Sequence, residues 1–257
     1  MNICRTVLLA SLVCVLGCSM AGRERSTKKE DKLLFAQAQK ALNARDFVDA
    51  IELLQIFIER FPESDGYPWA LQRLGESFEG LIEVEYVQPV QDGVQEPDVR
   101  SSFMETYGHF GCWEESPDGI RYDLSHYRKL LEAFPDCPIA DEAAFRSIRW
   151  EKKYGGRPEG ILRELDALED VLARYPSTSF RPEILYKMAY RCHVLYEIYL
   201  LSGNSGIRDR GLAEQYRSKT LYLYKLVLKT PDHSAFSEKA WQGMQALESG
   251  KTIYRMP

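Results

Sequence analysis

The sequence lacks the motifs that mark the commonest catalytic and nucleotide-binding sites. It contains no Gly-x-Ser-x-Gly turn for a nucleophilic serine, no glycine-rich loop that would cradle a phosphate and no His-Glu-x-x-His helix for a zinc ion. Histidine is scarce, with four in 257 residues. His109 and Cys112 have the spacing of two zinc ligands, but a structural zinc site needs four, and no second close pair follows. We therefore expect no enzyme, no metal site and no cofactor.

The chain also lacks an excess of basic residues. Lysine and arginine number 33 against 38 aspartates and glutamates, which gives a formal net charge of -5 at pH 7. A protein that binds nucleic acid usually presents a basic face. The mild acidity therefore argues against a nucleic-acid partner.

The apolar stretch at the start of the sequence is too short to span a membrane as a helix, which needs about 20 residues. It runs from Thr6 to Leu16 and fits the hydrophobic core of a secretory signal. It leads into Val15-Leu16-Gly17-Cys18, which resembles the bacterial lipobox, where a small residue precedes the lipidated cysteine. We expect residues 1–17 to be a signal peptide and Cys18 to carry a covalent lipid, such as palmitate. The alternative is an ordinary secretory signal that happens to contain a cysteine.

Residues 18–32 are mostly glycine, serine, threonine and charged residues, the composition of a flexible tether. Ser19 stands directly after the cysteine. The resemblance to other lipoproteins implies sorting to the outer membrane, since aspartate at this position is the usual signal for retention in the inner membrane. We therefore expect a lipid-anchored protein at the outer membrane that faces the periplasm.

Export would place the chain in an oxidising compartment, which permits disulfides. Besides Cys18, the mature chain has Cys112, Cys137 and Cys192. We expect Cys112 and Cys137 to form a disulfide, although the spacing of cysteines does not fix their connectivity. At least one thiol then stays free.

Helical hairpins account for most of the remaining sequence. From Leu33 to Pro62, apolar residues recur at steps of three and four, with a break at 43–46. Counted from Asp31 as position one, Ala50, Leu54 and Pro62 take the small, large and helix-ending positions of a tetratricopeptide-type repeat. Leu74-Gly75 opens a second unit, in which glycine lets the partner helix approach closely.

A proline after an apolar helix punctuates the chain four times, at Phe61-Pro62, Phe134-Pro135, Tyr175-Pro176 and Thr230-Pro231. Proline ends a helix, and a ring before it can fill the gap between neighbouring hairpins. We expect an all-α fold over residues 33–249. It consists of about four tetratricopeptide-type hairpins, the second interrupted by an insertion at about 84–121, and a capping helix near 235–249. Residues 250–257 form a C-terminal tail.

The first hairpin and its corner carry a resemblance to a known family. The segments Leu34–Leu42 and Asp46–Leu54, with Arg60-Phe61-Pro62-Glu63-Ser64, resemble the BamD family of outer-membrane lipoproteins. The resemblance is good over residues 31–80, moderate over 123–190 and thin beyond. It implies a component of the machinery that inserts β-barrel proteins into the outer membrane, with other subunits and unfolded barrel substrates as partners. The same hairpin occurs in the Tol-Pal system.

The insertion departs from that family. Residues 85–94 alternate polar and apolar side chains, which predicts a small hairpin or an extended arm. An aromatic-rich stretch follows. The segment is either a docking arm or lid, or a loop packed over the repeat.

Binding is the expected activity, because stacked hairpins leave a concave surface that takes peptides or partner helices. The first helix of each hairpin lines that surface, and an excess of basic groups there favours a negatively charged or carboxylate-ended ligand. The groove candidates are Gln37, Lys40, Gln72, Arg73, Arg146, Arg149, Lys187 and Arg191. The alternative for each is a solvated helix face. The alternative function is an adaptor of another envelope system, either Tol-Pal or cell-wall coordination or a pilot lipoprotein for a secretin.

Overall fold

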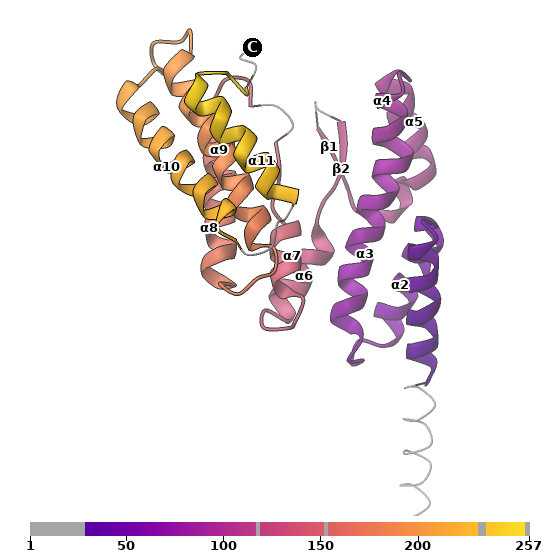
Figure 1. The fold of residues 1–257 in the computed structure, drawn as a ribbon. Coiled ribbons are helices and arrows are strands. Elements are labelled where there is room, and N and C mark those ends of the chain that lie inside the picture. The colour runs from indigo at the N-terminus through magenta and orange to yellow at the C-terminus, as the bar shows by residue number, and fades with distance from the viewer. Residues whose placement is uncertain (1–28, 117–118, 152–153, 231–234, 255–257) are drawn as a thin grey trace, which may run out of the picture. The chain divides into compact units, whose positions relative to one another are not determined.

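The computed structural model describes residues 29–116, 119–151, 154–230 and 235–254, which form two compact units, 1–140 and 141–257 (Figure 1). The expected signal peptide and Cys18 lie outside the described residues. Residues 29–32, assigned above to the tether, already belong to the first helix, which covers 29–43. Within the described part of the chain, no helix combines the length and the apolar character that a membrane span requires.

The first unit consists of two helical hairpins and the insertion. After the helix over 29–43, its elements are α2 (Phe47–Arg60), α3 (Tyr67–Ile82), a π-helical turn (Glu83–Val87), α4 (Gln88–Gln91), α5 (Glu96–Tyr107), a short 3-10 helix (Gly108–Phe110), β1 (Trp113–Ser116), β2 (Gly119–Tyr122) and α6 (Ser125–Ala133).

Close helix packing confirms the interrupted second hairpin. The helix over 29–43 and α2 form the first hairpin, in which the rings of Phe35 and Phe57 lie 5.7 Å apart. In the second, α3 packs against α6 although some forty residues separate them in sequence. A Cβ atom on Gly75 would lie 2.6 Å from the Tyr127 ring, so only glycine allows this approach. The role predicted for this glycine is therefore confirmed.

The corners between hairpins repeat one hydrogen-bonding pattern. Two residues after Pro62, the Ser64 hydroxyl donates to Asp31 Oδ2 at 2.7 Å. Two residues after Pro176, the Thr178 hydroxyl donates to Asp141 Oδ2 at 2.8 Å. In each corner the same hydroxyl oxygen also accepts a backbone N–H two residues further on, at 3.2 Å. Each corner thus ties the start of one hairpin to the start of the next.

The insertion is mainly helical, and the predicted extended arm over 85–94 is wrong. The chain stays helical from α3 through the π-helical turn and α4. Ile82, Tyr86 and Val90 are four residues apart along this helical stretch and face an apolar cluster with Val99 and Phe103. The π-helical turn precedes Pro89, which lacks the N–H that an α-helix needs there.

A short antiparallel hairpin completes the insertion. Strand β1 pairs with β2 in a register that places Trp113 opposite Tyr122 and Ser116 opposite Gly119. The buried Ile120 joins the insertion cluster, and Phe78 on α3 stacks on Tyr122 with ring centroids 5.3 Å apart. The insertion therefore packs over the second hairpin, as in the second of the two alternatives drawn from the sequence.

The second unit is also built from helices. Its elements are α7 (Ala140–Arg146), α8 (Glu159–Arg174), α9 (Arg181–Leu201), α10 (Arg210–Leu228) and α11 (Ala235–Ser249). Helices α9 and α10 form the fourth hairpin, and α11 packs on both, as expected for a capping helix. The all-α, tetratricopeptide-type fold predicted from sequence is confirmed.

The third hairpin is irregular because its first helix is short. Helix α7 has 7 residues whereas α8 has 16. The chain between them lacks helical structure where it is described, and Gly155 and Gly156 adopt φ of 58° and 74°, which favours glycine. Because α7 is so short, irregular segments cover parts of α8 and α9.

Candidate binding surface

The groove candidates of the first unit divide into exposed and buried positions. Gln37 and Lys40 are exposed on the first helix, as a binding surface requires. Gln72 is 1% exposed, so its prediction as an exposed groove residue is wrong. Arg73 is half-buried, and its guanidinium lies 2.6 Å from Glu76. Gln72 and Arg73 turn inward because α3 is covered by α2, α6 and the insertion.

In the second unit the structure gathers basic groups around one aromatic ring. Trp150 follows α7, and the Lys187 ammonium and Arg191 guanidinium of α9 lie 5.0 and 4.4 Å from its ring centroid. Phe145 lies 6.2 Å from the same ring. We name Phe145, Trp150, Lys187 and Arg191 the basic–aromatic cluster. Such cation–π contacts contribute on the order of 0.5–2 kcal/mol each.

Carboxylates neutralise most of these cations. Arg191 is 8% exposed, so it is not the exposed residue that the sequence suggested. Its Nε atom donates to Glu164 Oε2 at 2.6 Å. Lys187 lies 3.5 Å from Glu183, and Arg146 lies 2.8 Å from Glu142.

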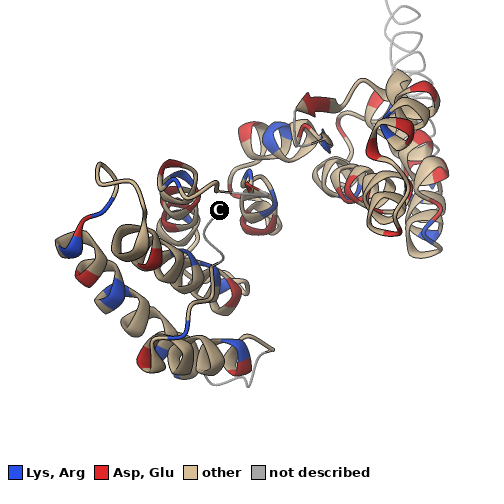
Figure 2. Ribbon diagram, turned by 90° about the horizontal axis from the view of Figure 1, so that it is seen from above, with Lys and Arg blue, Asp and Glu red and all other residues tan. Residues whose placement is uncertain are grey.

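This pairing leaves little net positive charge on the face. The negative charge of a ligand would therefore contribute little binding free energy there. Figure 2 shows the same interleaving of acidic and basic residues along the helices. Arg149, the residue before Trp150 in the sequence, is half-buried.

A buried network positions the segment that follows α7. Glu164 on α8 is 2% exposed. Its carboxylate accepts hydrogen bonds from the Glu151 backbone at 2.5 Å and from the Tyr154 hydroxyl at 2.9 Å, besides the one from Arg191. Because a buried carboxylate is costly unless paired and hydrogen-bonded, these donors explain how Glu164 is tolerated. Burial and the Glu164 charge raise the pKa of Tyr154, so this hydroxyl stays protonated and donates.

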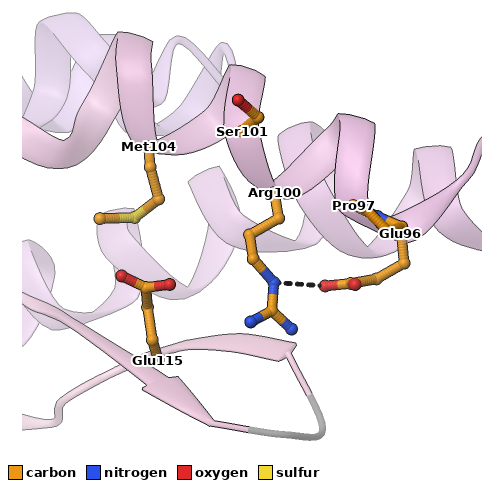
Figure 3. Close-up of a pocket in the computed structure, with 6 residues that line it drawn as sticks. All are labelled: Glu96, Pro97, Arg100, Ser101, Met104 and Glu115. Carbon is orange, nitrogen blue, oxygen red and sulfur yellow. Dashed lines mark hydrogen bonds and ion pairs between the residues drawn. The ribbon is translucent and has the colours of Figure 1, made fainter.

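The insertion carries a shallow pocket of about 430 Å³ between α5 and β1 (Figure 3). It is lined by Glu96, Pro97, Arg100, Ser101, Met104 and Glu115. Arg100 donates to Glu96 at 2.8 Å and to the Ser116 carbonyl at 3.3 Å, so its guanidinium is held in place. With two carboxylates against one guanidinium, the pocket suits a basic side chain better than an anion. The sequence did not single out these residues.

The two histidines near the insertion differ in burial. His126 stacks on Phe78 with centroids 5.4 Å apart, and its Nδ1 lies 2.8 Å from the Tyr122 hydroxyl. Burial lowers its pKa to about 4, so the ring is neutral at pH 7. His109 is exposed, with Nδ1 at 3.0 Å from the Thr106 carbonyl. Among the described residues, no three His, Cys, Asp or Glu side chains gather as a metal site would require.

The expected disulfide between Cys112 and Cys137 is not formed, and both are free thiols. The Cys112 carbonyl accepts from the Asp123 N–H at 3.0 Å, which places it near the start of α6. Cys137 follows the end of that helix, whose 9 residues span about 13 Å. Bridged cysteines need Cα atoms within about 7 Å of each other. Cys192 is a buried free thiol on α9.

Comparison with known proteins adds a structural likeness. No protein-family model matches the chain, and no curated protein matches its sequence. Among solved structures, the tetratricopeptide-repeat domain of P58(IPK) is similar over 91% of this chain and 70% of that one, with 14% sequence identity and a TM-score of 0.22. The hairpins described above carry the fold assignment. A fold of this type is typical of a non-catalytic scaffold that binds other proteins.

Proposed function

We propose that this protein is a non-enzymatic scaffold, anchored by a lipid on Cys18 to the outer membrane and facing the periplasm, with a BamD-like role in the assembly of β-barrel proteins. The observation that carries the scaffold function is the array of helical hairpins. Stacked hairpins offer an extended surface to peptides and partner helices and need no preformed catalytic cavity.

The exposed surface of the first hairpin supports this proposal. Gln37 and Lys40 remain exposed on the first helix, while Ala38, between them, is fully buried against the rest of the hairpin. This helix therefore has one face committed to the fold and one face open to a partner. The same segment carries the resemblance to the BamD family, in which early repeats receive unfolded substrate.

The anchor rests on the sequence alone. Gly17-Cys18 matches the end of a lipobox, and Ser19 favours the outer membrane over the inner. A multi-chain lipid would hold the protein stably, because each buried methylene contributes about 0.8 kcal/mol. Fractionation tests this step. The intact protein should sediment with outer membranes and the Cys18→Ser variant should not, whereas equal sedimentation of both contradicts a lipid anchor.

Co-purification from detergent extracts tests the role. The proposal predicts recovery of the barrel subunit of the outer-membrane assembly machinery with the tagged full chain. Recovery of peptidoglycan or cell-division proteins alone would support a Tol-Pal or cell-wall adaptor instead. A secretin that loses its outer-membrane location when the gene is deleted would support a pilot lipoprotein.

A further inference from the structure

The segment that follows α11 binds to a buried carboxylate on α9. Helix α11 ends where Gly250 adopts a φ of 70°, and the chain then runs without helical structure to Tyr254. The backbone N–H groups of Ile253 and Tyr254 donate to the two carboxylate oxygens of Glu197, at 2.7 and 2.8 Å. One side chain thus holds two successive peptide groups.

A second contact fixes the aromatic side chain of this segment. The Tyr254 hydroxyl oxygen accepts the Gly156 N–H at 3.0 Å. The Tyr254 ring lies 6.2 Å from the ring of Tyr154, which Glu164 holds in place. The irregular chain between α7 and α8 is therefore held by a segment 98 residues away in sequence.

The charge of Glu197 sets this site apart from the rest of the unit. Glu197 is 2% exposed, like Glu164, but Glu164 is paired with Arg191. His193 Nε2 lies 3.5 Å from Glu197 Oε1, and this nitrogen is buried with no hydrogen-bond partner among the described residues. Burial lowers the pKa of His193 to about 4, so the ring supplies no positive charge at pH 7. Among the described residues, hydrogen bonds from the two backbone N–H groups are thus the main stabilisation of this buried carboxylate.

These contacts recognise features that many extended peptides share. They use two successive backbone N–H groups and one phenolic oxygen, and the apolar side chain of Ile253 takes part in none of these three hydrogen bonds. We propose that Glu197, Gly156 and Tyr154 form an acceptor site for an extended polypeptide segment with a tyrosine after a non-proline residue. Residues 250–254 are its resident occupant, which a partner segment must displace. This inference rests on the proposed scaffold function and names one of its binding sites.

Peptide binding to the purified protein tests the site. The probe is a fluorescent peptide of residues 250–257, measured by anisotropy against the full chain and a variant that ends at Ser249. A tethered occupant acts at an effective concentration on the order of millimolar. If the free peptide binds the shortened variant with a micromolar Kd, the full chain should bind it at least about tenfold more weakly.

Matched peptides test the contacts. Replacement of Tyr254 by Ala removes the phenolic oxygen, and replacement of Ile253 by Pro removes one donor to Glu197. Each peptide should bind the shortened variant at least about tenfold more weakly than the parent peptide. Equal binding of all three, or equal binding of the parent peptide to both protein forms, would overturn the proposal.

A chain that can be cleaved after folding is the control for misfolding of the shortened variant. A protease site placed between Ser249 and Gly250 lets the intact protein fold before cleavage. Peptide binding should appear after cleavage and washing, and a cleaved chain that keeps its helical circular dichroism yet binds no peptide would refute the site. Because no cellular partner enters this assay, its failure leaves the co-purification result untouched, and a failed co-purification leaves peptide binding untouched.

Discussion

Substitution of Gly75 by alanine tests the helix packing that defines the second hairpin. A Cβ atom at this position would lie 2.6, 2.7 and 3.0 Å from three atoms of the Tyr127 ring. Tyr127 is fully buried, and its hydroxyl donates to Glu79 Oε2 at 3.0 Å. The ring therefore has no room to move away and would lose a hydrogen bond to a carboxylate if it did.

The expected loss follows from opposing contributions. Alanine favours a helix by about 1 kcal/mol over glycine. Overpacking a core costs about 1–3 kcal/mol, and a lost hydrogen bond to a charged group costs about 1.5–3 kcal/mol. Gly75→Ala should therefore lower the free energy of unfolding by about 1.5–5 kcal/mol, measured by urea denaturation followed by circular dichroism.

Two controls separate packing from backbone effects. Gly108→Ala should change stability little, because its Cβ would meet only Met104 Cε, at an ordinary 3.5 Å. In a Tyr127→Ala background the clash is absent, so Gly75→Ala should become neutral or stabilising. A Gly75→Ala protein as stable as the parent, or an equal loss in both backgrounds, would refute the close packing of α3 on α6.

Three further predictions concern the second unit. Burial lowers the pKa of His193 from 6.5 to about 4, so the stability given by its neutral form is complete above pH 6.5 and is lost as pH falls towards 4. His193→Gln should reduce the loss of unfolding free energy on acidification by up to about 3 kcal/mol, as measured by melts between pH 6.5 and 4. If the unfolding free energy of the variant falls with pH as steeply as that of the parent, burial of the ring is contradicted. Arg191→Met strands the Glu164 charge and should cost about 3–5 kcal/mol in urea denaturation, with a smaller loss when Glu164→Gln accompanies it; additive losses would contradict their coupling. Thr178→Val removes the corner bond to Asp141 and should cost about 1–2 kcal/mol in the same assay, and no loss would mean that the bond contributes nothing.

The helical repeat could be predicted because it depends on the spacing of residues that are close together in the sequence. Gly75, the corner prolines and the periodic apolar residues act within one or two hairpins, and the predicted capping helix near 235–249 matches α11. The alternation of polar and apolar residues over 85–94 led to the wrong prediction of an extended arm, because Tyr86 and Val90 fit one face of a helix as well as one face of a strand. Only the distant Val99 and Phe103, which cover that face, decide between the two.

The candidate surface was harder to predict because its partners are far apart in sequence. Arg191 was expected to be exposed, but Glu164, 27 residues earlier, draws it into the protein. The corner bonds of Ser64 and Thr178 could have been found, since each joins an aspartate 33 or 37 residues earlier, close to the repeat length. Glu197 carries one local signal, a lone charge between apolar residues of α9.

Photo-crosslinking in intact envelopes tests the central claim, that the first-helix face of the repeat binds protein partners. A crosslinking residue at Lys40, exposed on the first helix, is compared with one at Glu52, exposed on α2 of the same hairpin. The account predicts partner adducts from position 40, with the barrel subunit of the assembly machinery among them, and few from position 52. Equal adducts from both positions, or adducts from position 52 alone, would contradict it.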